Sequence, residues 1–453
     1  PAGFLTGDEA RMKTLQVRKT DLEEIGIHPK PGPITEDFRK AVADYQPDLI
    51  GFSIIEVTYR LSLELLRAVS DYRRSALRVF GGVHATFAPQ KLLAEELIDI
   101  VCVGEGEYPM LELCRALRDG GDHSRIPNLW VKGNGDALRN SLRPAVNLDA
   151  LPDQDWEIYE RERLWKPMGG KIWVTGTFEM NRGCPYSCLY CVNDGLNRLY
   201  EPLGGYYREK SIPVLIREMR DKKRRYSLQF AYLVAESFLT TTRERLVQFA
   251  ELYPAEVGLP FWGEARPESV TKEKVRLLEA CGCEGISLGV ESGNAEFRRR
   301  YMSRDMTDEK LIGAFAILAD SSLRVSANNV IGFPTETREM IFETIELNRK
   351  FPRVDGVMCA LYNPYHGTCL REVALEKGYI DPDTLAGDYR KETVMRMEHL
   401  TEAELRGLQR TFPLYVKFPK ALWPEIRRAE AFTPEGDRVY EELASEYRDR
   451  FMK

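Results

Sequence analysis

One loop reads Arg182-Gly183-Cys184-Pro185-Tyr186-Ser187-Cys188-Leu189-Tyr190-Cys191 and holds three cysteines at C-x-x-x-C-x-x-C spacing. Three thiolates bind only three irons of a 4Fe-4S cluster, whereas an electron-transfer ferredoxin normally supplies a fourth cysteine. The fourth iron then stays open to a non-protein ligand, which indicates chemistry at the cluster. A zinc knuckle or buried structural thiols are the alternatives, but zinc usually takes four ligands and no histidine or further cysteine lies within a few residues. We predict Cys184, Cys188 and Cys191 as catalytic cluster ligands.

The length and net charge of the chain limit the classes of protein to which it can belong. At 453 residues it is long for one hydrophobic core and suggests about two or three domains. The formal net charge of -6 does not favour electrostatic attraction to nucleic acid or to an anionic membrane, so neither is expected as a partner. No run of about 18 apolar residues and no secretion signal is visible, which predicts a cytoplasmic protein without a membrane span. The cysteines outside the loop lie in apolar or helical context and are expected to be reduced core residues.

Strand and helix signals alternate from Asp48 onward. Apolar runs at 48–53, 79–82 and 98–103 end in or before small residues, and a helical stripe follows each run. This order predicts a parallel sheet whose ligand binds beyond the carboxyl ends of the strands. The stretch 119–155 is rich in Gly, Asn, Asp and Pro, and we expect a linker that contains a hairpin there.

A second alternating series follows, and the cysteine loop comes directly after its first strand. The predicted strands are 174–181, 230–236, 260–264, 285–292, 325–332 and 356–362. Six β/α units predict a partial barrel, in which chemistry collects on the loops at the carboxyl ends of the strands. From Arg371 helical signals replace strand signals, and Thr401-Glu402-Ala403-Glu404 has the form of a capping box. A small helical domain is therefore expected at the C-terminus.

The cysteine loop and the barrel pattern resemble the radical SAM superfamily, in which the open iron binds the amino and carboxylate groups of S-adenosylmethionine. Their pairing with Gly81-Gly82-Val83-His84 and Val103-Gly104-Glu105-Gly106-Glu107 is similar to the cobalamin-binding subgroup. The resemblance covers residues 47–368. It implies an α/β fold with a Rossmann-like cobalamin-binding domain at 1–145, a partial (β/α)6 radical SAM barrel at 146–370 and the helical domain at 371–453. It also implies a flavodoxin- or ferredoxin-type electron donor.

The resemblance assigns the ligand contacts. For S-adenosylmethionine we expect contacts from Tyr190 (adenine), Glu236 (ammonium), Glu291 (ribose), Arg304 (carboxylate), and Ile331 and Gly332 (backbone near adenine). For cobalamin we expect contacts from Ser53, Gly81, Gly82, Gly104 and Glu105, because glycine turns admit a bulky nucleotide tail. Further side chains near strand ends are unranked candidates for the substrate pocket: Glu264, Arg266, Tyr362 and His366. The neighbouring arginines 298–300 are expected to be mostly solvated.

Two departures bear on cobalamin. The D-x-H-x-x-G motif that supplies a histidine to cobalt is absent, so any cobalamin should be bound without histidine ligation. The first residues also lack a recognisable strand with a Pro-Pro loop, which predicts either a domain incomplete at its N-terminus or the loss of cobalamin. If cobalamin binds, a bulky replacement of Gly104 should expel it without disturbing the cluster, because the two sites belong to separate domains.

The leading hypothesis is a cobalamin-dependent radical SAM enzyme that methylates an unactivated carbon of a small-molecule or natural-product substrate. A radical cyclase or rearrangement enzyme, with or without cobalamin, is the alternative within enzymes. A cobalamin or iron-sulfur carrier is the non-enzyme alternative, although a carrier needs no S-adenosylmethionine pocket. The cofactors would carry the difficult chemistry, and the protein would hold donor and substrate in line while excluding water.

Overall fold

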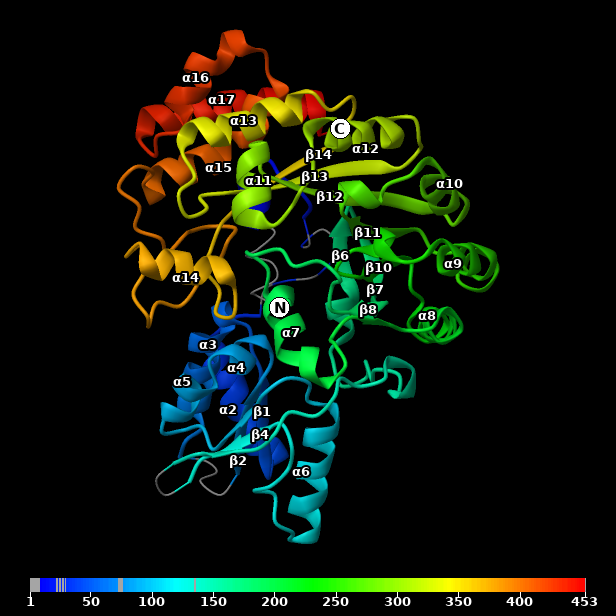
Figure 1. Ribbon diagram of the computed structural model, residues 1–453, viewed down its shortest axis with the longest axis vertical. Coiled ribbons are helices and arrows are strands. Elements are labelled where there is room, and N and C mark those ends of the chain that lie inside the picture. The colour runs from blue at the N-terminus through cyan, green and yellow to red at the C-terminus, as the bar shows by residue number, and fades with distance from the viewer. Residues whose placement is uncertain are drawn as a thin grey trace.

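The computed structural model describes residues 9–21, 23, 26, 28, 30–71, 76–133 and 136–452. Within them the chain forms a small sheet, a larger curled sheet and a helical C-terminal region. Figure 1 shows the small sheet and its helices at the bottom, the large sheet above it and the C-terminal helices at the top. The predicted α/β fold class, with a Rossmann-like N-terminal domain, a partial barrel and C-terminal helices in that order, is confirmed.

The small sheet has the strand order β1-β2-β3-β4-β5. Its strands are β1 (Leu49–Ser53), β2 (Leu77–Gly81), β3 (Ile100–Cys102), β4 (Leu129–Val131) and β5 (Leu138–Arg139). The first three are parallel, with Ser53 opposite Gly81, so their carboxyl ends meet at one edge of the sheet. The last two form an antiparallel hairpin, as predicted for the linker.

Helices cover this sheet because parallel strands need crossover connections. They are α2 (Ile34–Tyr45), α3 (Glu56–Ala68), α4 (Val83–Phe87), α5 (Pro89–Ala94) and α6 (Glu107–Asp119). On α3 the residues Tyr59, Leu63 and Leu66 recur at helical spacing and are buried, so one face of this helix joins the core of the small domain.

The large sheet has the strand order β14-β13-β12-β11-β10-β7-β6. Its six parallel strands are those predicted: β7 (Lys171–Glu179), β10 (Phe230–Val234), β11 (Phe261–Ala265), β12 (Cys283–Glu291), β13 (Arg324–Ile331) and β14 (Gly356–Leu361). The seventh strand, β6 (Trp165–Met168), was not predicted and pairs antiparallel with β7. It is short, sits at the sheet edge and contains Pro167, so its sequence carries no strand signal.

The helices of the barrel follow its strands. They are α7 (Val192–Tyr200), α8 (Ile212–Tyr226), α9 (Arg243–Glu256), α10 (Lys272–Ala280), α11 (Ala295–Met302), α12 (Asp308–Ala319), α13 (Arg338–Arg349) and α14 (Cys369–Glu376). A two-stranded sheet of β8 (Asn181–Arg182) and β9 (Arg208–Glu209) frames the cysteine loop. Along β11, Phe261 and Ala265 join the core, whereas Trp262 and Glu264 line a cavity inside the barrel.

The C-terminal region consists of α15 (Glu402–Lys417), α16 (Trp423–Ala429) and α17 (Pro434–Phe451). Thr401 caps α15 in the capping box that the sequence predicted. On the buried face of α15, Leu405, Leu408 and Phe412 belong to the same hydrophobic cluster as the barrel. These helices therefore extend the core of the barrel and do not enclose a separate core.

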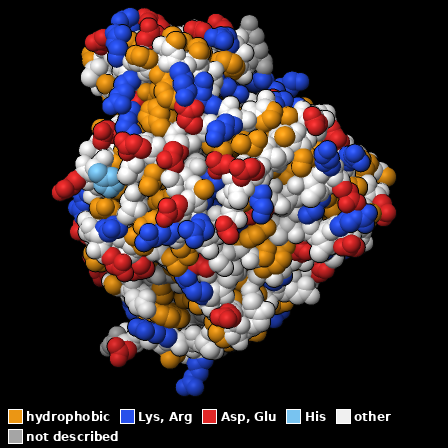
Figure 2. All heavy atoms as spheres, turned by 45° about the horizontal axis from the view of Figure 1, so that its top comes forward, with side chains coloured by type: hydrophobic (Ala, Val, Ile, Leu, Met, Phe, Trp, Pro, Cys, Tyr) orange, Lys and Arg blue, Asp and Glu red, His pale blue; other side chains and the backbone are white. Residues whose placement is uncertain are grey.

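The surface shows no large region of a single type on the face in Figure 2, where acidic and basic side chains alternate and apolar ones lie scattered between them. Scattered apolar side chains are normal on a folded protein. In the described part of the chain no helix is both long enough and apolar enough to cross a bilayer.

Candidate active site

The cysteine loop connects β8 to α7 near the centre of the molecule (Figure 1). Cys184 and Cys188 are buried, and Cys191 is the residue that precedes the first turn of α7. The unpaired amide groups of a helix N-terminus favour a thiolate at this position. Burial has the larger effect, because it raises the pKa of Cys184 and raises the pKa of Cys191 to about 11. A metal must therefore displace the thiol protons when it binds.

The arrangement of the thiols fits a cluster better than a single ion. The described residues contain one group of three His, Cys, Asp or Glu ligand atoms within 4.8 Å of one another, and it includes none of these cysteines. Cluster cysteines lie further apart than the ligands of one ion, because each binds a different iron. Arg266 Nη1 donates a 3.0 Å hydrogen bond to Cys188 Sγ and would stabilise the charge of that ligand. The donor set fits a 4Fe-4S cluster with one open iron.

Tyr190, Glu291 and Arg304 come from three separate segments and meet beside the cysteine loop. Arg304 Nη1 donates to Tyr190 Oη at 3.0 Å and to Glu291 Oε1 at 3.2 Å, and Arg304 Nη2 donates to the Gly289 carbonyl at 2.5 Å. Glu291 ends β12 with a φ of 66°, in the left-handed region that side chains seldom adopt. Such strain persists where the surrounding structure fixes the residue, often at functional sites.

The charges of this triad are set by burial and by one another. Burial raises the pKa of Glu291, and the attraction of Arg304 offsets only part of the rise. Burial alone would lower the pKa of Arg304, but Tyr190 and Glu291 hold it above its usual range, so the guanidinium keeps its proton. Arg304 Nε is buried without a hydrogen-bond partner. The triad offers the acceptor and donors that ribose hydroxyls and an amino-acid carboxylate require.

Glu236 is connected to the cysteine loop through Asn193. Asn193 Nδ2 donates to Glu236 Oε2 at 2.8 Å and lies 3.6 Å from Cys191 Sγ. Glu236 has solvent access, yet it sits in a recess where desolvation raises its pKa. A bound cation would reverse that shift, which suits the predicted contact with an ammonium group. Asn193 was not predicted, because an asparagine in the first turn of a helix carries no signal of such a contact.

The structure gives two arginines contacts that the sequence did not indicate. Arg266, a substrate candidate, contacts Cys188 and stacks 3.7 Å above the Tyr186 ring. Arg298 is fully buried and not solvated, whereas Arg299 and Arg300 are exposed as expected. Arg298 donates to the carbonyls of Ser292 and Met306, pairs with Asp308, and accepts from the amide of Arg304 at 2.9 Å through its own carbonyl. These bonds compensate its burial and shape the segment that carries Arg304.

Ile331 and Gly332 lie at the end of β13, where packing accounts for both. Ile331 is fully buried, and its carbonyl accepts from the amide of Tyr362 at 2.8 Å. A Cβ on Gly332 would lie 2.9 Å from Leu405 of α15, so the C-terminal helix requires the small residue. The Gly332 amide donates to Glu336 Oε2 at 2.6 Å. The contact of this turn with adenine stays a prediction.

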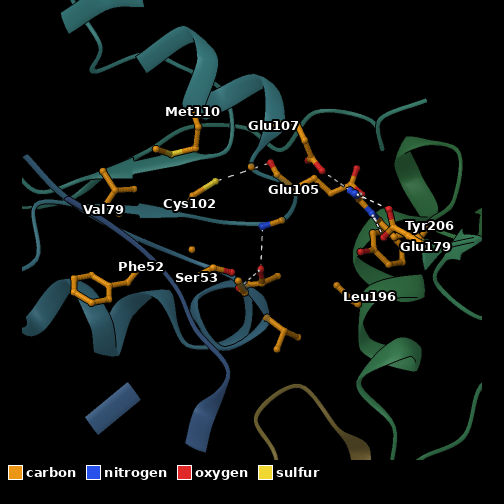
Figure 3. A pocket seen from close by; sticks show the side chains of 18 residues that line it. Phe52, Ser53, Val79, Cys102, Glu105, Glu107, Met110, Glu179, Leu196 and Tyr206 are labelled. Carbon is orange, nitrogen blue, oxygen red and sulfur yellow. Dashed lines mark hydrogen bonds and ion pairs between the residues drawn. The ribbon is translucent and has the colours of Figure 1, made fainter. Parts of the chain in front are cut away.

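A cavity of about 580 Å³ lies between the carboxyl ends of the small sheet and the barrel. Figure 3 shows Ser53, Cys102 and Glu105 on one side of it, and Leu196 and Tyr206 on the other. The residues predicted to contact cobalamin all line this cavity: Ser53, Gly81, Gly82, Gly104 and Glu105. The contacts that were predicted from three separate strand ends therefore line a single cavity.

Gly82 and Gly104 are also required by the protein itself. Their φ angles are 95° and 79°. A Cβ on Gly82 would lie 2.5 Å from the carbonyl oxygen of Ile54, and one on Gly104 would lie 2.2 Å from the hydroxyl of Tyr200. Tyr200 ends α7, the helix that begins after the cysteine loop. The expectation that a bulky residue at position 104 leaves the cluster region undisturbed is therefore wrong, since the two domains touch there.

Glu105 bridges the two domains through its charge. Its Oε1 accepts from Arg182 Nη1 at 2.8 Å and also from Arg208 Nη2. Arg182 pairs further with Glu107 at 2.7 Å and with Glu179 at 2.8 Å. Burial would lower the pKa of Arg182, but these carboxylates raise it above its usual range. Because Arg182 lies two residues before the first cysteine, this network joins the cavity wall to the cysteine loop.

A second cavity, of about 280 Å³, lies inside the half-barrel. The N-terminal segment 11–18 crosses its open side, where the Gln16 side chain exchanges two 3.0 Å hydrogen bonds with the backbone of Cys359. Among its lining side chains are Tyr232, Trp262, Glu264, Ser287 and Asn328. The substrate candidate Glu264 faces this cavity and accepts a 2.7 Å hydrogen bond from Tyr232.

The other two substrate candidates lie elsewhere. Tyr362 is buried, and its ring packs against Phe333 with centroids 4.9 Å apart. His366 lies at the boundary with the small domain, where its Nδ1 is 2.9 Å from Glu56 Oε1. Neither residue lines the cavity inside the barrel.

Comparison with known proteins assigns the barrel. The profile of the Radical SAM superfamily matches residues 178–347, from the end of β7 to α13, and this stretch contains the cysteine loop and the triad. Residues 178–347 therefore form a radical SAM domain. The profile of the B12 binding domain matches residues 13–114, which include β1, β2 and β3. The predicted membership of the cobalamin-binding subgroup is confirmed.

Several relatives align with most of the length of this chain. It is 25% identical over 406 residues to an uncharacterized methyltransferase of Pyrococcus horikoshii, across 87% of this chain and 84% of that protein. It is 26% identical over 349 residues to the anaerobic magnesium-protoporphyrin IX monomethyl ester cyclase of Cereibacter sphaeroides, across 74% of this chain and 54% of that protein. The methyltransferase TsrM of Kitasatospora setae, solved with cobalamin and a 4Fe-4S cluster, shares the fold with a TM-score of 0.64 at 17% identity, across 97% and 96% of the two chains.

These domains define the cofactors. The radical SAM domain uses a 4Fe-4S cluster and S-adenosylmethionine, and the B12 binding domain takes cobalamin. The three thiols fit the cluster, the triad fits the nucleoside and amino-acid groups, and the glycine-edged cavity fits a bulky nucleotide-bearing ligand. The chain is therefore an enzyme that contains a radical SAM domain.

Proposed function

We propose that this enzyme is a cobalamin-dependent methyltransferase that acts on an unactivated carbon of a small molecule. The observation that carries the proposal is the position of the cavity between the domains. Its wall includes Glu179 and Arg182, and Arg182 lies two residues before Cys184. A ligand in this cavity and a ligand on the cysteine loop would therefore be neighbours. The name of the Pyrococcus horikoshii relative also supports methyl transfer.

The cofactors, when bound, supply the electron that cleaves S-adenosylmethionine and the carrier of its methyl group. The protein residues bind and orient. Glu291 would accept from the ribose hydroxyls, Arg304 would hold the carboxylate, and Glu236 would receive the ammonium. Fixing these ends positions the reactive groups for the next step. A flavodoxin- or ferredoxin-type protein would deliver the electron, and we place the enzyme in the cytoplasm.

The cavity inside the half-barrel is the proposed substrate site. Its volume of about 280 Å³ suits a small molecule or one part of a larger one. Glu264 with Tyr232 provides a polar anchor, and Trp262 provides an apolar surface. The segment 11–18 covers the open side of the barrel and would exclude water. We therefore favour a substrate that combines a polar group with an apolar carbon.

Cobalamin binding is tested by anaerobic reconstitution with hydroxocobalamin, iron and sulfide, followed by visible spectroscopy. Ser53→Trp would fill the cavity from the end of β1, whereas Leu111→Trp adds the same ring at an exposed position on α6. We expect wild type and Leu111→Trp to retain about one cobalamin per chain, and Ser53→Trp to retain at least tenfold less at unchanged iron. Failure of the wild type to retain cobalamin would contradict the proposal.

The products of S-adenosylmethionine separate methyl transfer from ring formation. Loss of the methyl group leaves S-adenosylhomocysteine, whereas reductive cleavage leaves methionine and 5′-deoxyadenosine. We expect the reduced enzyme to release both nucleosides, and candidate substrates to gain mass from S-adenosylmethionine labelled in its methyl group. Release of 5′-deoxyadenosine alone would favour the cyclase or rearrangement reaction.

The cyclase is the second candidate because of the 26% identity to the Cereibacter sphaeroides cyclase. A carrier without catalytic activity would not need the buried triad of Tyr190, Glu291 and Arg304 beside the cysteine loop. We therefore do not favour the carrier.

A further inference from the structure

Three metal-ligating side chains meet where the small domain contacts the barrel, outside the sites described above. Glu56 begins α3, His84 lies on α4, and His366 follows β14. One ligand atom of each lies within 4.8 Å of the other two, and this is the group of three that the described residues contain. Figure 1 shows α3 directly below α14, the helix to which the His366 segment leads.

The distances suit a shared tetrahedral ion. Glu56 Oε1 is 2.9 Å from His366 Nδ1, and Glu56 Oε2 is 3.7 Å from His84 Nδ1. An ion with bonds of about 2.0–2.1 Å holds tetrahedral ligand atoms about 3.3 Å apart. The two distances, which involve different oxygens of the Glu56 carboxylate, lie on either side of that value. The two imidazole rings are in T-shaped contact with centroids 5.2 Å apart, and one ligand atom of each ring lies within 4.8 Å of the other and of Glu56.

The imidazole nitrogens lack hydrogen-bond partners. Both ring nitrogens of His84 and both of His366 are buried without an aligned hydrogen bond, although the Nδ1 of each ring lies near the Glu56 carboxylate. His366 Nδ1 is close to Glu56 Oε1, but the contact does not have the alignment of a hydrogen bond. A neutral imidazole carries one donor and one acceptor, and buried polar groups are nearly always satisfied. A metal ion would satisfy one nitrogen of each ring.

The carboxylate is oriented by bonds that leave it free to coordinate. The amides of His366 and Ala386 donate to Glu56 at 3.0 and 2.7 Å, one to each oxygen, so each oxygen keeps a lone pair. Such bonds orient metal ligands in known sites. Arg371 Nη1 is 3.9 Å from Glu56, but the guanidinium donates to three carbonyls, those of Pro364, Pro382 and Thr384. The Glu56 carboxylate is therefore not held in a hydrogen bond by Arg371.

We propose that Glu56, His84 and His366 bind a divalent zinc-type ion that clamps the small domain to the barrel. Two imidazoles and one carboxylate are a known zinc ligand set, with water in the fourth position. The ion would connect α3 and α4 with the segment after β14. Because α4 also contributes Val83 and Thr86 to the wall of the large cavity, the clamp would hold that wall in place.

The test measures zinc in protein whose cluster has been reconstituted. After equilibration with zinc and gel filtration we expect about one zinc per chain in the wild type. Glu56→Gln, His84→Phe and His366→Phe should each weaken binding by at least about 100-fold, the upper range for loss of a supporting residue. Tyr59→Phe is the control, because its ring lies 5.2 Å from the His84 ring without contributing a ligand. It should retain zinc.

Zinc at the cysteine loop is distinguished by its ligands. The zinc K-edge spectrum should show only nitrogen and oxygen at about 2.0–2.1 Å, with no sulfur near 2.3 Å. Alanine at Cys184, Cys188 and Cys191 together should leave this zinc in place. A wild type without zinc, sulfur ligation, or equal zinc in all three ligand variants would each overturn the proposal. If a variant fails to fold, the wild-type spectrum still decides. None of these measurements depends on methyl transfer.

Discussion

Replacing Glu291 with glutamine tests the triad beside the cysteine loop. The Arg304–Glu291 pair is 3.2 Å long, and the two side chains are 2% and 13% exposed. The substitution keeps the shape and one acceptor but removes the negative charge. A hydrogen bond to a charged group contributes about 1.5–3 kcal/mol and a neutral one about 0.5–1.5 kcal/mol, so each affected bond should lose about 1–1.5 kcal/mol.

Two ribose hydroxyls bound by this carboxylate would lose roughly 2–3 kcal/mol together, which weakens S-adenosylmethionine binding about 30- to 150-fold. The free energy of unfolding should fall by only about 1–1.5 kcal/mol, because one internal bond to Arg304 is affected. Glu291→Ala should cost about 3–5 kcal/mol of stability, because it leaves the buried guanidinium without its counter-ion. The glutamine variant thus separates binding from folding.

The assay is equilibrium dialysis of S-adenosylmethionine against anaerobically reconstituted protein, with iron analysis and urea unfolding alongside. Glu284→Gln is the matched control, since Glu284 lies on the same strand but is exposed. Unchanged affinity in Glu291→Gln at full iron content would remove Glu291 from the binding site. A loss of iron would show instead that Glu291 supports the cysteine loop.

Three further outcomes are expected. Alanine at any one cluster cysteine should abolish cluster absorbance and S-adenosylmethionine cleavage, by iron analysis and product assay. Gly104→Ala should lower stability by about 1–3 kcal/mol in urea unfolding, and Tyr200→Phe should recover part of it. Burial raises the pKa of Glu336 from 4.5 to about 8. Between these pH values the folded protein keeps a proton that the unfolded chain releases, so the free energy of unfolding should fall as the pH rises from 4.5 to about 8. Glu336→Gln should flatten this fall by up to about 1.4 kcal/mol per pH unit, and identical profiles would contradict the assignment.

Local patterns in the sequence were sufficient for the fold and for the cluster ligands. The three cysteines lie within one loop, so their spacing alone indicates a shared metal group. Each strand of the barrel is a short run rich in apolar residues, and parallel strands place their carboxyl ends at one edge. That geometry explains why Glu291, at a strand end, meets Tyr190 of the cysteine loop.

Contacts between distant segments could not be predicted. Arg298 looks like a surface residue because its sequence neighbours are charged. It is nevertheless buried, and its guanidinium donates to the carbonyls of Ser292 and Met306 around the segment that carries Arg304. Arg266 reaches Cys188 from a different strand end, and no local pattern distinguishes it from a substrate contact. Gly104 lines the large cavity as expected, but its small size is also required by the hydroxyl of Tyr200, which no local pattern indicates. In each case the missing information is a tertiary neighbour.

The boundary between the domains is built from directional polar contacts, which fix the two proposed cofactor sites relative to each other. An apolar interface tolerates sliding, but buried charges are stable only when their partners stay in place. Arg182 joins Glu105 of the small domain to Glu179 of the barrel, and Glu56 accepts amides from beyond β14. These contacts fix the large cavity against the cysteine loop at two separated points. Transfer between two bound cofactors requires such a fixed geometry, because small displacements of reacting groups cost large factors in rate.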